Sequence, residues 1–206
     1  MPSRALFATP LFEASLTDGK GGDALIAELA DAIHDLAQND GAGRAWSRDH
    51  GYKGYTSYAS LTDLHRRYPA FAELKKRLDR HAAAFAAELA FDLDGRRLVL
   101  EDLWVNLLKP GGGHSGHIHP HSVLSGTVYV DIPAGASAIK FEDPRLGLMM
   151  AAPPRLKDAP EATRTFVYVQ PAAGSVLMWE SWLRHEVPPN TAKAERLSVS
   201  FNYAWK

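Results

Sequence analysis

Cysteine is absent from the 206 residues of this chain. The absence excludes disulfide bonds, thiolate metal sites and a cysteine nucleophile, so any bound metal must be held by nitrogen and oxygen atoms. An excess of charge is also missing, because 23 basic residues nearly balance 24 acidic ones. The sequence has no basic run with interleaved aromatic residues, which argues against a nucleic-acid surface and favours a small-molecule or peptide partner.

Long apolar runs are missing as well. Segment 1–16 has no apolar stretch of the length that a signal peptide needs, and no later segment approaches a membrane span. We therefore expect a cytoplasmic protein with no membrane partner. The length predicts one domain over 1–206, in which 1–95 is mainly helical support and 96–206 forms the core. Apolar residues on the helices could supply the face of a homodimer.

The first half of the chain has the apolar spacing of amphipathic helices. The two stripes consist of Leu25, Ile26, Leu29, Ile33 and Leu36, and of Phe71, Leu74, Leu78, Phe85 and Leu89. Residues spaced by three, four or seven share one helix face, and Pro69 stands where a first helical turn tolerates proline. Between the stripes, 41–60 is rich in Gly, Ser and Tyr and is predicted to be a loop, either a connector or a substrate lid.

From about Arg96 onward the pattern becomes that of short strands. The β-rich runs are 96–108, 122–132, 137–143, 164–170, 174–179 and 196–205. Such runs, separated by Gly, Pro and polar breaks, predict a sandwich or barrel. The break from Pro144 to Thr163, with Met149 and Met150, is longer than an ordinary hairpin loop. It lies either over the mouth of the barrel or outside it as a surface insertion.

Four of the nine histidines occur within GGGHSGHIHPHS, at positions 114, 117, 119 and 121. In an extended segment residues i and i+2 point to the same side, so His117 and His119 can present their imidazoles to one metal ion. Pro120 interrupts regular pairing, which makes His121 less suited to that face. A single histidine is more often an ordinary surface or core residue, whereas this density favours a nitrogen-rich metal site.

A distant histidine and an arginine complete the pattern. His185 follows the apolar run 174–179, and a second strand could deliver it to the same metal as a third ligand. Arg196 begins a run in which polar and apolar residues alternate, so its strand should have one polar face. An arginine inside a barrel needs an anion. That anion is either a bound carboxylate or a structural Asp or Glu.

The second half of the sequence resembles the 2-oxoglutarate and Fe(II)-dependent dioxygenase superfamily. The similarity is to a bacterial family of oxygenases with the pattern W-x-N, G-x-x-x-x-H-x-H-P and S-G-x-x-Y. The matching residues are Trp104, Asn106, Gly112, His117, His119, Pro120, Ser125, Gly126, Tyr129, Asp143, Arg145, His185 and Arg196. The resemblance implies an α+β, mainly β fold, with a cupin-like jelly roll, or double-stranded β-helix, as its core and the N-terminal helices packed on it.

The resemblance also implies the cofactors, the reaction and the roles of single residues. Fe(II) would be bound by His117, His119 and His185, with 2-oxoglutarate as cosubstrate, and O2 would be used to hydroxylate a substrate with release of succinate and CO2. The residues implied for cosubstrate binding are Arg196, which would hold the distal carboxylate, and the helpers Ser198, Tyr129 and Asn106.

His119 departs from the pattern, because most relatives have Asp or Glu at this position. The exchange leaves the site one unit more positive, which can alter its affinity for metal and cosubstrate. It also leaves room for His121 or His114 to complete the metal site instead.

Three other interpretations compete with this one. A cupin-like three-histidine metal protein, either a dioxygenase independent of 2-oxoglutarate or a non-catalytic binding module, would share the HxH pair but has no need of Arg196. A metallo-hydrolase would require an aspartate before His121, and a bare scaffold would leave four clustered histidines unexplained. Trp104, Trp179 and Trp182 fit a role in the core or the cavity wall better than a catalytic one.

Overall fold

The computed structural model describes residues 6–145 and 150–206 of the chain. Its elements are β1 (Phe12–Ser15), α1 (Gly22–Asn39), α2 (Gly41–Asp49), β2 (Gly54–Thr56), η1 (Leu64–Arg66), α3 (Pro69–Glu88), β3 (Leu98–Leu108), β4 (His114–His117), β5 (Leu124–Asp131), β6 (Ile139–Glu142), η3 (Glu161–Thr163), β7 (Phe166–Val169), β8 (Ser175–Glu180), β9 (His185–Val187) and β10 (Arg196–Trp205). Helices dominate the first half and strands the second, as the apolar spacing predicts.

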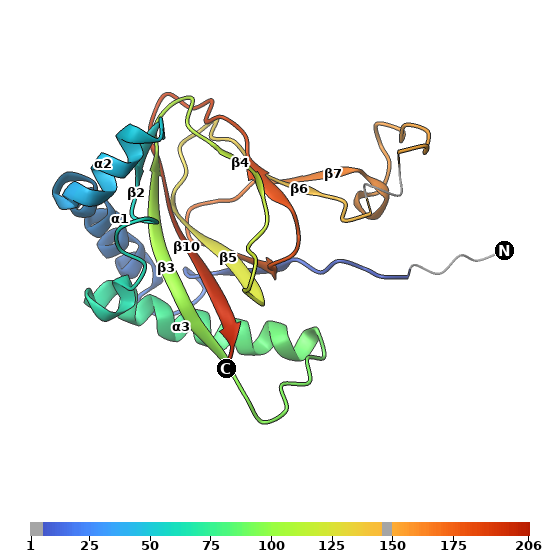
Figure 1. Ribbon diagram of the computed structural model, residues 1–206, viewed down its shortest axis with the longest axis horizontal. Helices are drawn as coiled ribbons and strands as arrows, with labels where there is room; N and C mark the ends of the chain where they lie inside the picture. The colour runs from blue at the N-terminus through green and yellow to red at the C-terminus, as the bar shows by residue number, and fades with distance from the viewer. Residues whose placement is uncertain (1–5, 146–149) are drawn as a thin grey trace.

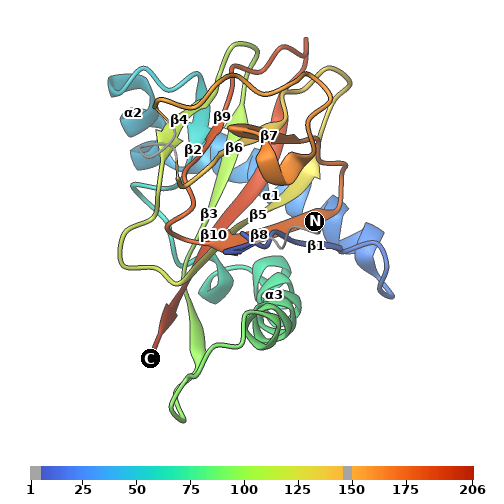
Figure 2. The same ribbon diagram turned by 90° about the vertical axis from the view of Figure 1, so that its right-hand side faces the viewer.

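The strands form two sheets that lie on either side of one interior. Over the described ranges, one sheet has the order β1-β8-β5-β10-β3-β2 and the other has the order β4-β9-β6-β7. Neighbouring strands in both sheets run antiparallel. Figures 1 and 2 show the smaller sheet on one side of the larger sheet and the helices on the other. The arrangement confirms the expected jelly roll with N-terminal helices packed on it.

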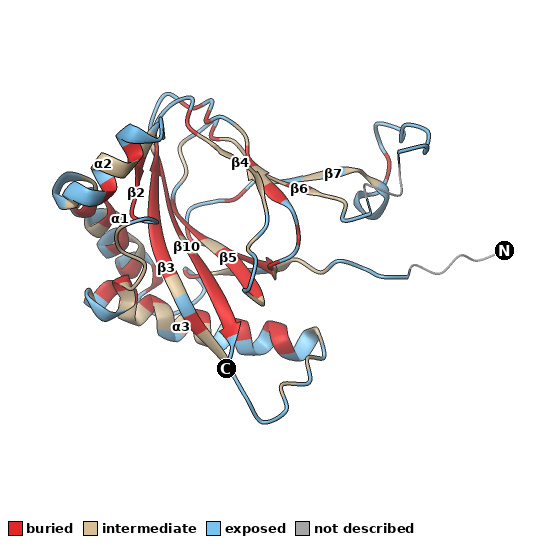
Figure 3. Ribbon diagram, viewed as in Figure 1, coloured by how far each residue is buried: buried red, intermediate tan, exposed pale blue. Residues whose placement is uncertain are grey.

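Both predicted helices are present, and their apolar stripes face the larger sheet. The buried side of α1 carries Leu25, Leu29, Ile33 and Leu36, and α3 begins at the predicted proline. These side chains pack in one hydrophobic core with residues of the larger sheet. Figure 3 shows buried residues along β3, β5 and β10 and on the sides of the helices that meet them. The helices therefore stiffen the wall of the barrel from outside.

The prediction of a loop over 41–60 is wrong. The segment forms helix α2 and strand β2, and β2 pairs with β3 at the edge of the larger sheet. The helix is stabilised at its start by Asp40, whose side chain accepts a hydrogen bond from the Gly43 backbone N–H at 3.0 Å. Only Gly43 and Ser47 of α2 are buried. A helix that buries so little apolar surface leaves no apolar stripe in the sequence.

Strand β10 separates two environments with its two faces. Leu197, Val199, Phe201 and Tyr203 belong to the hydrophobic core on the helical side. The alternate residues are polar and point into the barrel, where Arg196 and others are buried. The predicted alternation is thus confirmed, and it gives the barrel interior a polar lining along one of the central strands of the larger sheet.

The described residues of the connection between β6 and β7 project away from both sheets (Figure 1). Met149 of the predicted break lies outside the described residues, and Met150 is 90% exposed. Trp182, expected in the core or the cavity wall, is 47% exposed, so that expectation is wrong. Among the described residues, no helix combines the length and apolar character needed to cross a bilayer.

Gly126 lies where two strands leave no room for a side chain. A Cβ atom at this position would collide with the Phe201 ring and with the backbone carbonyl of Leu177. We predict that Gly126→Ala lowers the free energy of unfolding by about 2 kcal/mol, because overpacking a close-packed core forces backbone shifts.

Urea unfolding measures this change. Gly41→Ala is the matched control, since nothing lies within 4 Å of a Cβ added there. Equal stability of the two variants would contradict the close approach at Gly126.

Candidate metal centre and cavity

Three histidines from different segments converge inside the barrel. Among the described residues, His117, His119 and His185 form the one group of potential ligands, with a nitrogen from each within 4.8 Å of the others. Their ring centroids are 4.4 to 5.1 Å apart. His117 ends β4 and pairs directly with His185, the first residue of β9, in the smaller sheet. The structure therefore brings together the three residues that the sequence singles out.

The placement of His185 differs from the sequence interpretation in one respect. It does not end the strand formed by the apolar run, because β8 stops at Glu180 and a turn follows. His185 instead opens the separate short strand β9, which belongs to the other sheet. The turn moves the chain across the barrel, and this crossing is what brings His185 to His117.

Each imidazole of the group is oriented by a hydrogen bond from its Nδ1 atom. The acceptor is the backbone carbonyl of Ser115 for His117 at 2.7 Å, and that of Leu183 for His185 at 2.9 Å. For His119 it is the side-chain Oδ1 of Asn202, at 2.8 Å. These oxygens can only accept, so Nδ1 carries the hydrogen and Nε2 keeps its lone pair. Hydrogen bonds of this kind fix the tautomer and direction of metal-binding histidines.

Two of the rings, His119 and His185, are also held in the neutral form that binds metals. Burial is the main cause that lowers the pKa of His185 to about 3 and that of His119 to about 4. The Nε2 atom of His119 is buried and has no hydrogen-bond partner among the described residues. A buried nitrogen lone pair without a partner is costly unless something binds it. The donor set fits Fe(II), and it equally suits Zn, Ni or Cu.

The two alternative histidines lie apart from this group. His114 is hydrogen-bonded through Nε2 to the Tyr52 hydroxyl at 2.7 Å. His121 has a left-handed backbone conformation, with φ at 71°, and is exposed. Neither contributes a nitrogen to the three-histidine group.

Arg196 is buried without an acidic partner. The residue is 2% exposed. Among the described residues, its Nε atom has no hydrogen-bond partner, and no carboxylate forms an ion pair with its guanidinium. The guanidinium lies 5.1 Å from the centroid of the Tyr129 ring, whose hydroxyl also lacks a partner. A desolvated guanidinium without an anion costs several kcal/mol, about 3 to 5 when a partner is removed. The alternative that a structural Asp or Glu pairs with Arg196 is therefore wrong for the described residues.

A polar network joins the remaining predicted residues to two that sequence reasoning missed. The Oδ1 atom of Asn106 accepts hydrogen bonds from Thr56 at 2.8 Å and from Tyr52 at 3.4 Å, and its amide donates to Ser200 at 3.1 Å. Ser198 is buried opposite Asn106 in the β10–β3 register. Tyr52 and Thr56 come from the segment expected to be a loop, so no signal in the sequence linked them to the site.

The histidine group opens into a cavity of about 680 Å³. Its described lining includes the three histidines together with Trp46, Tyr52, Thr56, Tyr58, Glu101, Asp102, Trp104, Asn106, Ser200 and Asn202. Arg196, Ser198 and Tyr129 do not line it, but burial and then the charge of Arg196 lower the pKa of His114, a lining residue, to about 3. No described residue of 144–163 lines the cavity, so that part of the segment is a surface insertion rather than a cover.

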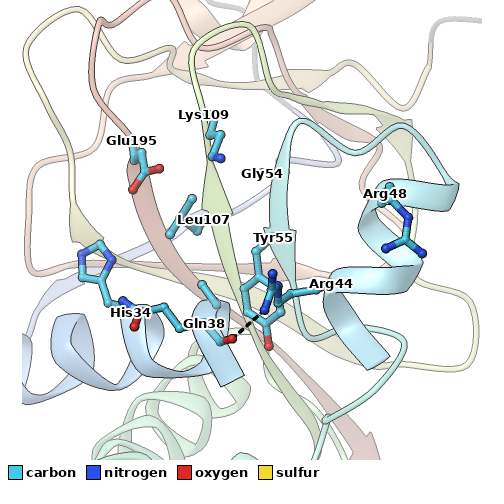
Figure 4. Close-up of a pocket in the computed structure, with 10 residues that line it drawn as sticks. His34, Gln38, Arg44, Arg48, Gly54, Tyr55, Leu107, Lys109 and Glu195 are labelled. Atoms are coloured by element: carbon cyan, nitrogen blue, oxygen red, sulfur yellow. Dashed lines mark hydrogen bonds between the residues drawn. The ribbon is translucent and has the colours of Figure 1, made fainter. Parts of the chain in front are cut away.

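A second cavity of about 570 Å³ lies on the helical side of the larger sheet. Figure 4 shows His34 and Gln38 of α1 opposite Arg44 and Arg48 of α2, with Lys109 nearby. It shares no described lining residue with the histidine cavity. Its cations are exposed, and Arg48 forms an ion pair with Asp49. The chemistry therefore concentrates in the histidine cavity.

The hydrogen bond between Asn202 and His119 is expected to set metal affinity. We predict that Asn202→Ala weakens binding about 10-fold, because the imidazole loses the acceptor that fixes its tautomer. Calorimetric titration with Ni(II), which resists oxidation, measures the change. Ser200→Ala, on the same strand face but without a bond to an imidazole, should stay within about 2-fold of the parent. Equal affinities in the two variants would rule out the orienting role of Asn202.

Comparison with known proteins agrees with this geometry. The sequence model of a family described as "Putative 2OG-Fe(II) oxygenase" matches residues 102–202. This span contains the three histidines and Arg196. None of the curated proteins compared with the chain matches it.

Several solved structures have a similar fold. A Pseudomonas putida prolyl-4-hydroxylase is 17% identical with a TM-score of 0.61, over 95% of this chain and 93% of that one. The epimerase SnoN from nogalamycin biosynthesis, in complex with Fe3+, alpha ketoglutarate and nogalamycin RO, is 18% identical with a TM-score of 0.63, over 95% and 79%. HygX from Streptomyces hygroscopicus, with nickel and 2-oxoglutarate bound, is 15% identical with a TM-score of 0.59, over 95% and 82%.

At these identities the similarity to solved structures establishes the fold alone. The family model matches most of the strand-rich half of the chain. Through residues 102–202, the chain matches the model of a family of 2-oxoglutarate- and Fe(II)-dependent oxygenases.

Proposed function

We propose that this protein hydroxylates a C–H bond of a small-molecule or peptide substrate, with Fe(II) at His117, His119 and His185 and with 2-oxoglutarate anchored by Arg196. The observation that carries the proposal is a buried guanidinium without an acidic partner among the described residues, in the same barrel as three convergent imidazoles. A buried unpaired charge and a buried lone pair without a partner each lower the free energy of unfolding. The proposed 2-oxoglutarate would pair with the charge, and the proposed Fe(II) would bind the lone pairs.

The chain's part in metal binding is to present three preoriented lone pairs. When bound, Fe(II) with 2-oxoglutarate and O2 supplies the oxidising chemistry, and the cosubstrate leaves as succinate and CO2. The carbonyls of Ser115 and Leu183 and the amide of Asn202 keep each Nδ1–H engaged, so that Nε2 faces the centre of the group. Neutral ligands give the site one more positive charge than a set that includes a carboxylate.

The chain's part in cosubstrate binding is to neutralise and orient a buried carboxylate. Arg196 would accept the distal carboxylate of 2-oxoglutarate in a charge-assisted pair, and the unpartnered Tyr129 hydroxyl could donate to the same group. The amide of Asn106 donates one hydrogen to Ser200, and its other hydrogen could be donated to the cosubstrate. Ser198 lies directly opposite Asn106 and adjacent to Tyr129 in the sheet, where it would support the same end of the ligand.

One observation favours a second candidate, a three-histidine dioxygenase that needs no 2-oxoglutarate. The metal group consists of three imidazoles and contains no carboxylate. Such a protein does not need a buried arginine, however, and the free energy of desolvating the guanidinium would not be offset by a bound anion. The unpartnered Arg196 therefore favours the first candidate.

Removing the charge of Arg196 tests the proposal. In the Ni(II)-loaded protein, Arg196→Met should raise the Kd for 2-oxoglutarate by about 30-fold or more, the equivalent of about 2 kcal/mol for a lost buried charge pair. The affinity for 2-oxobutyrate, which lacks the distal carboxylate, should stay the same. Calorimetry measures both ligands, and Arg196→Lys, which keeps the charge, should lose less.

Two results would reject the assignment. An unchanged Kd for 2-oxoglutarate in Arg196→Met would show that the guanidinium does not bind the distal carboxylate. Absence of 2-oxoglutarate binding in the parent protein, with Ni(II) bound to the histidines, would shift the function to the three-histidine candidate.

A further inference from the structure

The part of the histidine cavity outside the metal group carries acidic and aromatic side chains. Its described lining includes Glu101 and Asp102 and contains no Lys or Arg. Arg196 is buried and does not line the cavity, and in the proposed function its charge is paired with the distal carboxylate of the cosubstrate. An anionic group entering this space would therefore meet carboxylates and find no fixed cation from the described lining.

The two carboxylates are not equivalent. Glu101 is exposed and forms an ion pair with Lys206, with 2.6 Å between Oε1 and Nζ. Asp102 is half-buried, and among the described residues it has no side-chain hydrogen bond or ion pair. Asp102 is thus the free acidic group of the cavity, while the charge of Glu101 is already balanced.

The position of Asp102 places it beside the metal group. It lies directly opposite Asn202 in the β3–β10 register. The Asn202 side chain holds His119 with a 2.8 Å hydrogen bond. Directly opposed residues in an antiparallel pair have Cβ atoms about 5 Å apart. Only Asn202 therefore lies between the carboxylate of Asp102 and the proposed metal ligand His119.

One aromatic ring lies on the same strand face as this carboxylate, and a second packs against that ring. Trp104 follows Asp102 by two residues and lies on the same face of β3, with its ring centroid 6.1 Å from that of His119. Tyr58 packs edge-on against Trp104 at 5.3 Å and is 56% exposed at the cavity. Aromatic faces attract cations, and the attraction grows where the cation is partly desolvated.

We propose that the substrate carries an ammonium or guanidinium group, which Asp102 binds while the attached apolar stem lies against Trp104 and Tyr58. This inference deepens the proposed function and rests on it, since it concerns the substrate of the same cavity. The carboxylate would hold the cationic end of the substrate, and the aromatic wall would direct the stem past His119 toward the metal group. Specificity would then come from charge at one point and from shape along the wall.

Matched ligands that differ in one charge test the proposal. The pairs are N-acetylarginine amide with N-acetylcitrulline amide, and N-acetyllysine amide with N-acetylnorleucine amide. Calorimetry on the Ni(II)- and 2-oxoglutarate-loaded protein should show at least one cationic member bound 10-fold or more tighter than its neutral partner. In Asp102→Asn this preference should fall below 2-fold, whereas in Glu101→Gln it should persist.

Tyr58→Ala provides a variant that cannot fail by misfolding of the barrel, because the side chain is largely exposed. It should weaken the cationic ligand at least 3-fold. The same basic residue placed in a glycine-flanked pentapeptide distinguishes the sources of the cation: tighter binding than the amide indicates a peptide substrate, and equal or weaker binding indicates a free amine.

Equal binding of charged and neutral partners, no binding of any cationic probe, or a preference that survives in Asp102→Asn would overturn the proposal. The binding of 2-oxoglutarate, measured first on the same sample, separates this failure from that of the proposed function. A charge preference without 2-oxoglutarate binding would remove the assignment of 2-oxoglutarate as cosubstrate and leave the cation site in place.

Discussion

The pairing of β10 with both β3 and β5 is the constraint on which the rest of the structure depends. This strand has an apolar face toward the helices and a polar face toward the interior, so one run of residues builds the core and furnishes the site. A shift of its register by one residue would turn Leu197 and Phe201 inward and Arg196 and Asn202 toward the helices. Packing of the apolar face in the core therefore determines the register of β10, and this register determines which polar side chains point into the site.

The interior is organised around groups that lack partners within the chain. The Nε2 atom of His119, the Nε atom of Arg196 and the Tyr129 hydroxyl are all buried without a hydrogen bond in the part of the chain that the structure describes. The surrounding polar atoms are well satisfied, as in the network of Asn106, Tyr52 and Thr56. Unpaired polar atoms at the proposed metal and cosubstrate positions are what a site prepared for a cation and an anion would present. Nδ1 of His65, in η1, is a further buried atom without a partner among the described residues.

Much of this arrangement could be predicted from local patterns. The two apolar stripes predict the helices, and the spacing of His117 and His119 predicts that they share a face, because both signals depend on the geometry of a few consecutive residues. The alternation after Arg196 likewise predicts a strand with one polar face. In each case the residues that carry the signal are neighbours in the sequence.

Other features depend on contacts between distant segments and left no local trace. Asn202 holds His119 across 83 residues, and Tyr52 reaches His114 across 62. Helix α2 was missed because it buries little apolar surface, and the turn after Glu180 hid the transfer of His185 to the smaller sheet. The exposure of Trp182 also depends on this turn, which an apolar residue count cannot anticipate.

The most direct test of the central claim, that one site holds both the metal and the cosubstrate, is an anaerobic titration of the Fe(II)-loaded protein with 2-oxoglutarate, followed by visible spectroscopy. Chelation of the metal by the cosubstrate produces a charge-transfer band, so we predict a saturable band that requires Fe(II) and is lost in His185→Ala. His121→Ala, which alters a histidine outside the group, should retain it. Stoichiometric Fe(II) bound by the parent protein with no band at saturating 2-oxoglutarate would contradict the account.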